Sequence, residues 1–219
     1  MDRLQEIFDH QRELMKKYHP IEEANGLLQT SSVPVNLHDK HGQARLKDFM
    51  WRTTEEIGEA VDPSIMKLEV RMEEWADALH FLTELSILST DLFVEELGVF
   101  CLQKDAQLRE DIHNEKFKGD TLDIVFKCVW SWLQRCRQEP YYWAGQAIFE
   151  LGLASNELKN RPWKQSHKDT DVRAYLDRLF GVWECFIAAC ICVGFTPDTL
   201  YEHYMGKNKI NQERQNNGY

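Results

Sequence analysis

Apolar residues recur at spacings of three and four positions along almost the whole chain, which is the pattern of one face of an α-helix. The strict alternation of apolar and polar residues that marks β-strands is nearly absent. Proline and glycine divide the pattern into separate segments. The sequence therefore predicts an all-α fold, a helical bundle, with helices over about 2–18, 43–61, 65–89, 92–118, 121–138, 141–158, 171–193 and 197–212.

The predicted helix 65–89 is apolar on nearly all of its sides after Trp75, so we expect it to lie at the centre of the bundle. On this helix Glu74 and Asp77 share a face with Phe81. Buried carboxylates are unfavourable unless positive charge lies beside them. The position of these two acids therefore needs a chemical explanation.

The preceding helix, 43–61, carries a second acid pair at the same spacing. Glu56 lies at the margin of the apolar stripe that includes Ile57, and Glu59 lies on the same side, whereas Glu55 points away. Two such pairs on consecutive helices predict carboxylates that face and repel one another, and a divalent cation would relieve this repulsion. An all-oxygen ligand set suits Mg²⁺, or Mn²⁺, rather than zinc. Solvated acidic faces are the alternative, since the chain has 36 Asp and Glu.

Composition and charge narrow the class of protein. The 219 residues, of which 43% are hydrophobic and 28% charged, fit one globular domain. A formal charge of −10 argues against binding to a nucleic-acid backbone, but it permits a small phosphorylated ligand. The apolar run 185–195 is too short to span a bilayer, and MDRLQEIFDHQREL lacks the apolar core of a signal peptide. We therefore expect neither a nucleic acid nor a membrane as partner.

The six cysteines form no C-x-x-C pair, and several lie in apolar helical segments. Zinc ligands and disulfide frameworks usually show regular cysteine spacings. Buried, reduced thiols in a cytoplasmic protein are therefore the expected state.

A basic and amide-bearing stripe occurs in the last predicted helix. Lys207, Asn211 and Arg214 are spaced at i, i+4 and i+7, which places them on one helix face. A lysine, an amide and an arginine fork in a row match the oxygens of a polyphosphate. A solvated basic helix end is the alternative.

These segments together resemble a known family. Glu56-Ile-Gly-Glu59 followed by Glu74-Trp-Ala-Asp77 resembles the ExxE…ExxD pattern of the all-α nucleoside triphosphate pyrophosphatases. The continuation DALHF (77–81) is similar to that of the dimeric all-α dUTPases and the related phage dCTP pyrophosphatase. The tail residues that match this branch are Tyr204, Lys207, Asn208, Asn211, Arg214, Gln215, Gly218 and Tyr219.

The resemblance implies a set of roles. The Mg²⁺ ligands would be Glu56, Glu59, Glu74 and Asp77, and Glu56 would also be the general base. The phosphate chain would contact Lys207, Asn211, Arg214 and Tyr219. The nucleobase would contact Gln11 and His80. The implied reaction is hydrolysis of a deoxynucleoside triphosphate to the monophosphate and pyrophosphate by a homodimer.

Departures from the family pattern leave the identity of the substrate's nucleobase open. Met15 stands near the position of an expected amide, and Lys67 only partly replaces a Trp- and Lys-bearing segment of the dUTPases. We expect dUTP as substrate, with dCTP or another nucleotide as alternatives. A helical regulatory or interaction protein without catalytic activity is the alternative of a different class.

The second half of the chain resembles a degenerate copy of the first. In this pairing Arg178 stands at the position of Glu74, and Gly181 at that of Asp77. The expected organisation is a single domain over 1–219. Its parts would be an active half at about 1–118, a degenerate half at about 119–195, and a phosphate-binding tail at 197–219.

Overall fold

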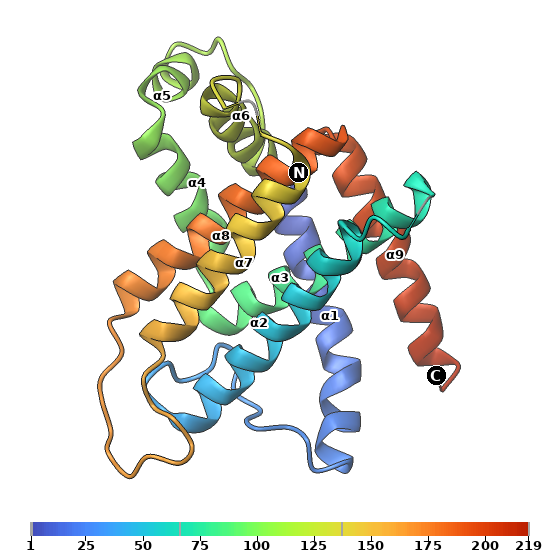
Figure 1. Ribbon diagram of the computed structural model, residues 1–219, viewed down its shortest axis with the longest axis vertical. Coiled ribbons are helices and arrows are strands. Elements are labelled where there is room, and N and C mark those ends of the chain that lie inside the picture. The colour runs from blue at the N-terminus through green and yellow to red at the C-terminus, as the bar shows by residue number, and fades with distance from the viewer. Residues whose placement is uncertain (1, 66, 137, 219) are drawn as a thin grey trace.

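The computed structural model describes residues 2–65, 67–136 and 138–218 (Figure 1). Within these ranges the chain forms nine helices and no strand, which confirms the predicted all-α fold. The helices are α1 (Arg3–Ala24), α2 (Lys40–Ala60), α3 (Leu68–Ser89), α4 (Phe93–Lys104), α5 (Ala106–His113), α6 (Thr121–Leu133), α7 (Pro140–Glu157), α8 (Val172–Val193) and α9 (Pro197–Asn216).

Most helix boundaries differ from the prediction by a few residues, and two of the differences have identifiable reasons. α1 continues through Pro20 to Ala24, because a proline in an exposed final turn removes only one backbone donor. The predicted helix 92–118 is divided into α4 and α5 at Asp105, whose carboxylate accepts a hydrogen bond from the Leu108 backbone N–H at 2.9 Å. This aspartate is an N-cap, and it starts a new helix rather than continuing the old one.

Two helical hairpins, α2–α3 and α7–α8, form the most extensive helix pairings of the bundle. α2 and α7 run beside each other across one face of the molecule, α8 runs alongside α7 on the side away from α2, and α3 lies behind α2 (Figure 1). α3 also contacts α1, α4 and α9, and nearly all its residues from Trp75 to Ser89 are buried. The predicted central position of this helix is confirmed.

Aromatic side chains and two polar contacts join α3 to α8. The ring of Trp75 meets that of Phe186 edge-on, with centroids 5.5 Å apart. The indole N–H of Trp183 donates to the Ser86 hydroxyl at 2.9 Å, and the hydroxyls of Ser89 and Tyr175 lie 2.8 Å apart. Such contacts satisfy buried polar atoms while the rings fill the core. α3 is therefore a rigid platform for the acids that it carries.

The beginning of α1 is anchored to α6 and α9 by Arg3. Its Nε lies 2.8 Å from an Asp120 oxygen and its Nη2 2.6 Å from an Asp123 oxygen, and Nη1 contacts Asp198. Farther along, α9 packs against α1 and α3 through the fully buried Tyr204. The tail helix is therefore part of the bundle.

None of the described helices is by itself long and apolar enough to cross a bilayer. α8 and α9 together meet the length and composition criterion, but they are bent by 100° relative to each other.

Candidate active site

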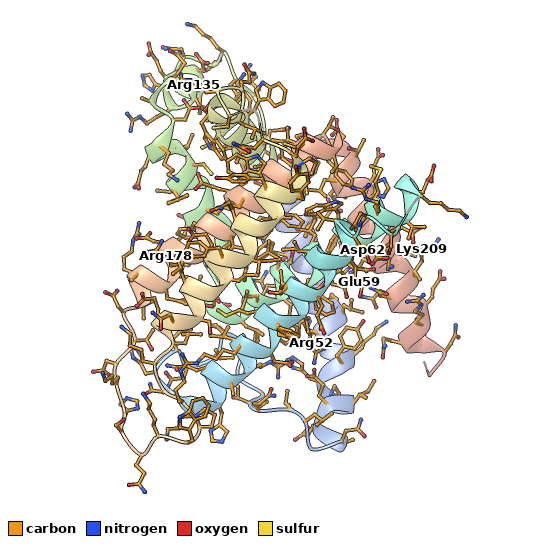
Figure 2. All side chains as sticks on the ribbon, in the orientation of Figure 1. Arg52, Glu59, Asp62, Arg135, Arg178 and Lys209 are labelled. Atoms are coloured by element: carbon orange, nitrogen blue, oxygen red, sulfur yellow. The ribbon has the colours of Figure 1, made fainter. Side chains whose placement is uncertain are left out.

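Three carboxylates from α2 and α3 meet at one place. Oxygen atoms of Glu56, Glu59 and Glu74 all lie within 4.8 Å of one another. Glu56 and Glu59 are one turn apart on α2, and the hairpin brings the first half of α3 beside them. Arg52 and Glu59 lie along α2 on the side of the molecule where α1 and α9 run (Figure 2).

The fourth predicted ligand, Asp77, has a different partner. Its Oδ2 lies 2.6 Å from Nζ of Lys207 on α9, and both side chains are less than one-fifth exposed. Asp77 nevertheless lies near enough to the other acids to raise the pKa of Glu56. The structure thus brings three of the four predicted ligands together and pairs the fourth with a residue predicted to bind phosphate.

The acids repel one another, and this repulsion contributes to the raised pKa values of Glu56 and Glu74. Burial raises the pKa of Glu56 from its ordinary value of 4.5 to about 7, and the charges of Asp77, Glu59 and Glu74 add to the increase. The pKa of Glu74 is also raised, by burial and then by Asp77 and Glu59. Carboxylates that resist ionisation beside one another fit a site for a hard divalent cation, which would stabilise all of them in the charged form.

This electrostatic conflict leads to a stability prediction for the metal-free protein. A carboxyl whose pKa is raised on folding lowers stability progressively as pH rises from about 4.5 to about 7. Glu56→Gln removes this penalty, so we expect it to stabilise the chelator-treated protein at pH 8 and not at pH 5. Because Glu56 is partly solvated, the gain should be about 1–2 kcal/mol, or roughly 3–6 °C in Tm. Thermal melts at the two pH values test this, and equal shifts at both would contradict it.

A cavity of about 490 Å³ adjoins the acids and lies among α1, α2, α3 and α9. Glu56 and Asp77 line it, together with the aromatic rings of Phe49 and Phe81. These two rings lie 6.2 Å apart, and the Arg52 guanidinium sits 5.0 Å from the Phe49 ring centroid. The cavity therefore has an anionic region and an aromatic wall.

The tail helix supplies the cationic side of the same cavity. Lys207, Asn211 and Arg214 all line it, as does Gln215. Their positions agree with the prediction that they share one helix face. Tyr219, the remaining predicted phosphate ligand, lies outside the described residues.

Both residues predicted to contact the base line the cavity and are almost completely buried. The Gln11 amide donates to Glu84 Oε2 at 2.8 Å and accepts from the Tyr204 hydroxyl at 2.9 Å. Nδ1 of His80 lies 2.8 Å from the Ala76 carbonyl, so this nitrogen carries the hydrogen. Its Nε2 is then an acceptor, buried and with no hydrogen-bond partner among the described residues. Burial lowers the pKa of His80 to about 4, which keeps the ring neutral.

A family model described as dUTPase matches residues 64–219, well over half of the chain. The chain belongs to the all-α dUTPase family. Membership supports a nucleotide pyrophosphohydrolase activity and a nucleotide substrate. The matched segment of this dUTPase-family chain includes Glu74, Asp77 and His80, whereas Glu56 and Glu59 precede it. No curated protein and no solved structure matches the chain.

Sequence reasoning missed Glu84, a charged residue of this dUTPase-family site, and Arg45, which does not line the cavity but lies 3.9 Å from Glu84. Glu84 lines the cavity although it is only 3% exposed, and Arg45 is 1% exposed. Arg45 donates to the Thr30 carbonyl at 2.9 Å, and its Nη2 lies 3.3 Å from a Glu22 oxygen. The sequence does contain a sign that Glu84 is special, because it is a lone acid within the apolar run FLTELSILS, seven residues after Asp77. It contains none for Arg45, because the residues that pair with it are distant in sequence.

Proposed function

We propose that this protein hydrolyses dUTP to dUMP and pyrophosphate with Mg²⁺, or Mn²⁺, as cofactor. One observation carries the proposal: Glu56 of the acid cluster, Asp77 and the Lys207–Arg214 face of α9 border the same cavity. A triphosphate is a ligand that satisfies both sides, because it binds a cation–carboxylate cluster and basic side chains together.

The four acids have the chemistry to hold the cation. All are carboxylates, and three of them already have oxygens within 4.8 Å of one another. A bound Mg²⁺ ion would neutralise phosphate oxygens and make the attacking water more acidic. Asp77 would complete the ligand set once Lys207 no longer engages it.

We assign to Glu56 the role of accepting the proton of the attacking water. Glu56 lines the cavity, and its ionised carboxylate, the form that a bound cation would favour, is the form that accepts a proton. The water oxygen bonds to the α-phosphorus, the bond from this phosphorus to the bridging oxygen breaks, and pyrophosphate leaves. The proton lost by water passes to Glu56. The carboxylates of Glu59 and Glu74 would hold the cation in position as its ligands.

Lys207 would have two partners in this scheme, Asp77 before the substrate binds and a phosphate oxygen afterwards. We expect Lys207→Gln to tighten Mg²⁺ binding to the nucleotide-free protein, because Asp77 then has no competing cation. The same change should raise KM for dUTP roughly 10–100-fold through loss of a charged hydrogen bond. Calorimetry and steady-state kinetics measure the two effects. Lys209→Gln, an exposed neighbour on α9, is the matched control. If Lys207→Gln weakened the binding of both Mg²⁺ and dUTP, or tightened the binding of both, the scheme would be contradicted.

A homodimer is part of the proposal. Several large apolar side chains on the outer surface of α2 and α7 are solvent-exposed, among them Trp51 at 62% and Phe149 at 58%. Exposed aromatic residues on neighbouring helices are typical of a protein interface. Sedimentation of the purified protein should give twice the mass of the 25.9 kDa chain.

The proposed compartment is the cytoplasm. All six cysteines are free thiols, and Cys101, Cys128 and Cys190 are buried. Such a pattern suits a reducing environment. Labelling of thiols in the protein taken directly from cells would test it.

The experiment that tests the function is a substrate panel. The protein is incubated with Mg²⁺ and each deoxynucleoside triphosphate, and monophosphate and pyrophosphate are measured. We expect dUTP to give the highest kcat/KM. Failure to hydrolyse any of them would favour a protein that binds partners without catalysis, and a preference for dCTP would correct the substrate.

A further inference from the structure

Another carboxylate, that of Glu84, lines the cavity and is separate from the acid cluster. It lies two helical turns beyond Asp77 on α3, a rise of about 10 Å at 1.5 Å per residue. Phe81 and His80 lie between these two positions and also line the cavity. If phosphates lie at Asp77 and Lys207, Glu84 is at the end where the nucleobase sits.

The surroundings of Glu84 fix the orientation of Gln11. Gln11 Nε2 donates to Glu84 at 2.8 Å, and Gln11 Oε1 lies 2.9 Å from the Tyr204 hydroxyl, whose hydrogen is shared with the Ile7 carbonyl at 3.1 Å. Rotating the amide by 180° would bring its oxygen against the carboxylate, which is repulsive. Gln11 is therefore held as a donor, and its second N–H remains for a ligand.

Arg45 supplies positive charge near the Glu84 carboxylate and shares it with Glu22. Arg45 Nη2 lies 3.9 Å from Glu84 Oε1. Burial raises the pKa of Glu84 to about 7, the Gln11 hydrogen bond and the charges of Arg45 and Arg52 oppose this increase, and Glu22 adds to it. A ligand N–H that donates to Glu84 favours its ionised form. Glu84 and Gln11 thus offer an acceptor beside a donor at the buried end of the cavity.

Uracil carries the complementary pattern, an N3–H donor flanked by two carbonyl acceptors, whereas cytosine has an acceptor at N3. We propose that Glu84 accepts the N3–H of uracil while Gln11 donates to an adjacent carbonyl, so that Glu84 is a specificity-determining residue of the site. This assignment rests on the proposed dUTP hydrolysis. Tyr204 acts through Gln11 and is a positioning residue.

Exchange of the carboxylate for an amide tests the assignment directly. In Glu84→Gln the amide oxygen remains with Gln11, and an N–H₂ group replaces the acceptor that faces N3. We expect the ratio of kcat/KM for dUTP to that for dCTP to fall at least about 100-fold, mainly through KM for dUTP. Calorimetry with the α,β-imido analogues of dUTP and dCTP should show the same shift in affinity without turnover.

Glu184→Gln is the matched control. Glu184 is another buried glutamate with a cationic partner, Lys104 at 2.6 Å, and it is on α8, away from the cavity. It should leave the dUTP-to-dCTP ratio unchanged. An equal shift in both variants would overturn the assignment, because the effect would then come from any buried charge.

A second arm uses the unaltered protein, so it does not depend on the folding of a variant. N3-methyl-dUTP lacks the N3–H, and we expect its kcat/KM to be at least about 100-fold below that of dUTP. Equal use of the two nucleotides, or a preference of the unaltered protein for dCTP, would overturn the role of Glu84 while leaving nucleotide hydrolysis intact. Absence of any hydrolysis would instead overturn the proposed function, and this inference with it.

Discussion

Glu56→Gln is expected to lower kcat for dUTP by about 10³-fold or more, because it removes a general base and a cation ligand at once. Glu56 is the acid with the most strongly shifted pKa of the cluster, and all the neighbouring acids contribute to that shift. An amide in its place has no proton affinity near neutral pH. Single-turnover kinetics at saturating Mg²⁺ measure the loss.

Glu55→Gln is the control for that variant, because Glu55 is the adjacent residue on α2 and is exposed. It should retain normal kcat. Circular dichroism should show the same helical content for both variants. Normal turnover by Glu56→Gln would remove this residue from the mechanism.

Removal of divalent cations is the second change with a large expected effect. Without a cation, a triphosphate in the cavity would meet the carboxylates of Glu56 and Asp77, with Glu59 and Glu74 close behind, and all of these groups are anionic. Chelation should therefore lower turnover below detection, and added Mg²⁺ or Mn²⁺ should restore it.

The expected recovery is saturable in the cation concentration. Mg²⁺ should also raise the Tm at pH 8, because it relieves the repulsion within the cluster. A rate in excess chelator equal to that with Mg²⁺ would contradict the cofactor assignment.

Local sequence patterns predicted the all-α fold and the meeting of three of the acids, although the segment 92–118 forms two helices and not one. Two helices joined by a short turn pack side by side, so acids spaced i, i+3 on their facing sides come close together. Oxygen atoms of Glu56, Glu59 and Glu74 do lie within 4.8 Å of one another. The common face of Lys207, Asn211 and Arg214 follows from helix geometry in the same way. In each case the relevant spacing lies within one helix or one hairpin.

Contacts between distant segments could not be predicted in this way. The pair Asp77–Lys207 joins α3 to α9, and the Gln11–Glu84–Tyr204 chain joins α1, α3 and α9. Periodicity shows that a face is buried, but it does not show which helix covers it. The role proposed for Glu84 depends on its contacts with Gln11 and Arg45, which the sequence alone does not show.

The predicted internal duplication stays a prediction, although the hairpins α2–α3 and α7–α8 are alike in form. In the second hairpin Arg178 Nη1 lies 3.4 Å from an oxygen of Glu150 on α7. Gly181 is also next to this carboxylate, since a Cβ there would lie 3.5 Å from it. In the predicted pairing of the two halves, this ion pair corresponds to the acid cluster of the first hairpin.

The proposed function depends on the acids of α2 and α3 binding a divalent cation together with the nucleotide. A titration with Mn²⁺, followed by electron paramagnetic resonance in the presence of α,β-imido-dUTP, tests it most directly. Saturable binding by the unaltered protein, weakened at least about 10-fold by Glu59→Gln and by Glu74→Gln but not by Glu55→Gln, is the predicted result. Equal Mn²⁺ affinity in all four proteins would contradict the account.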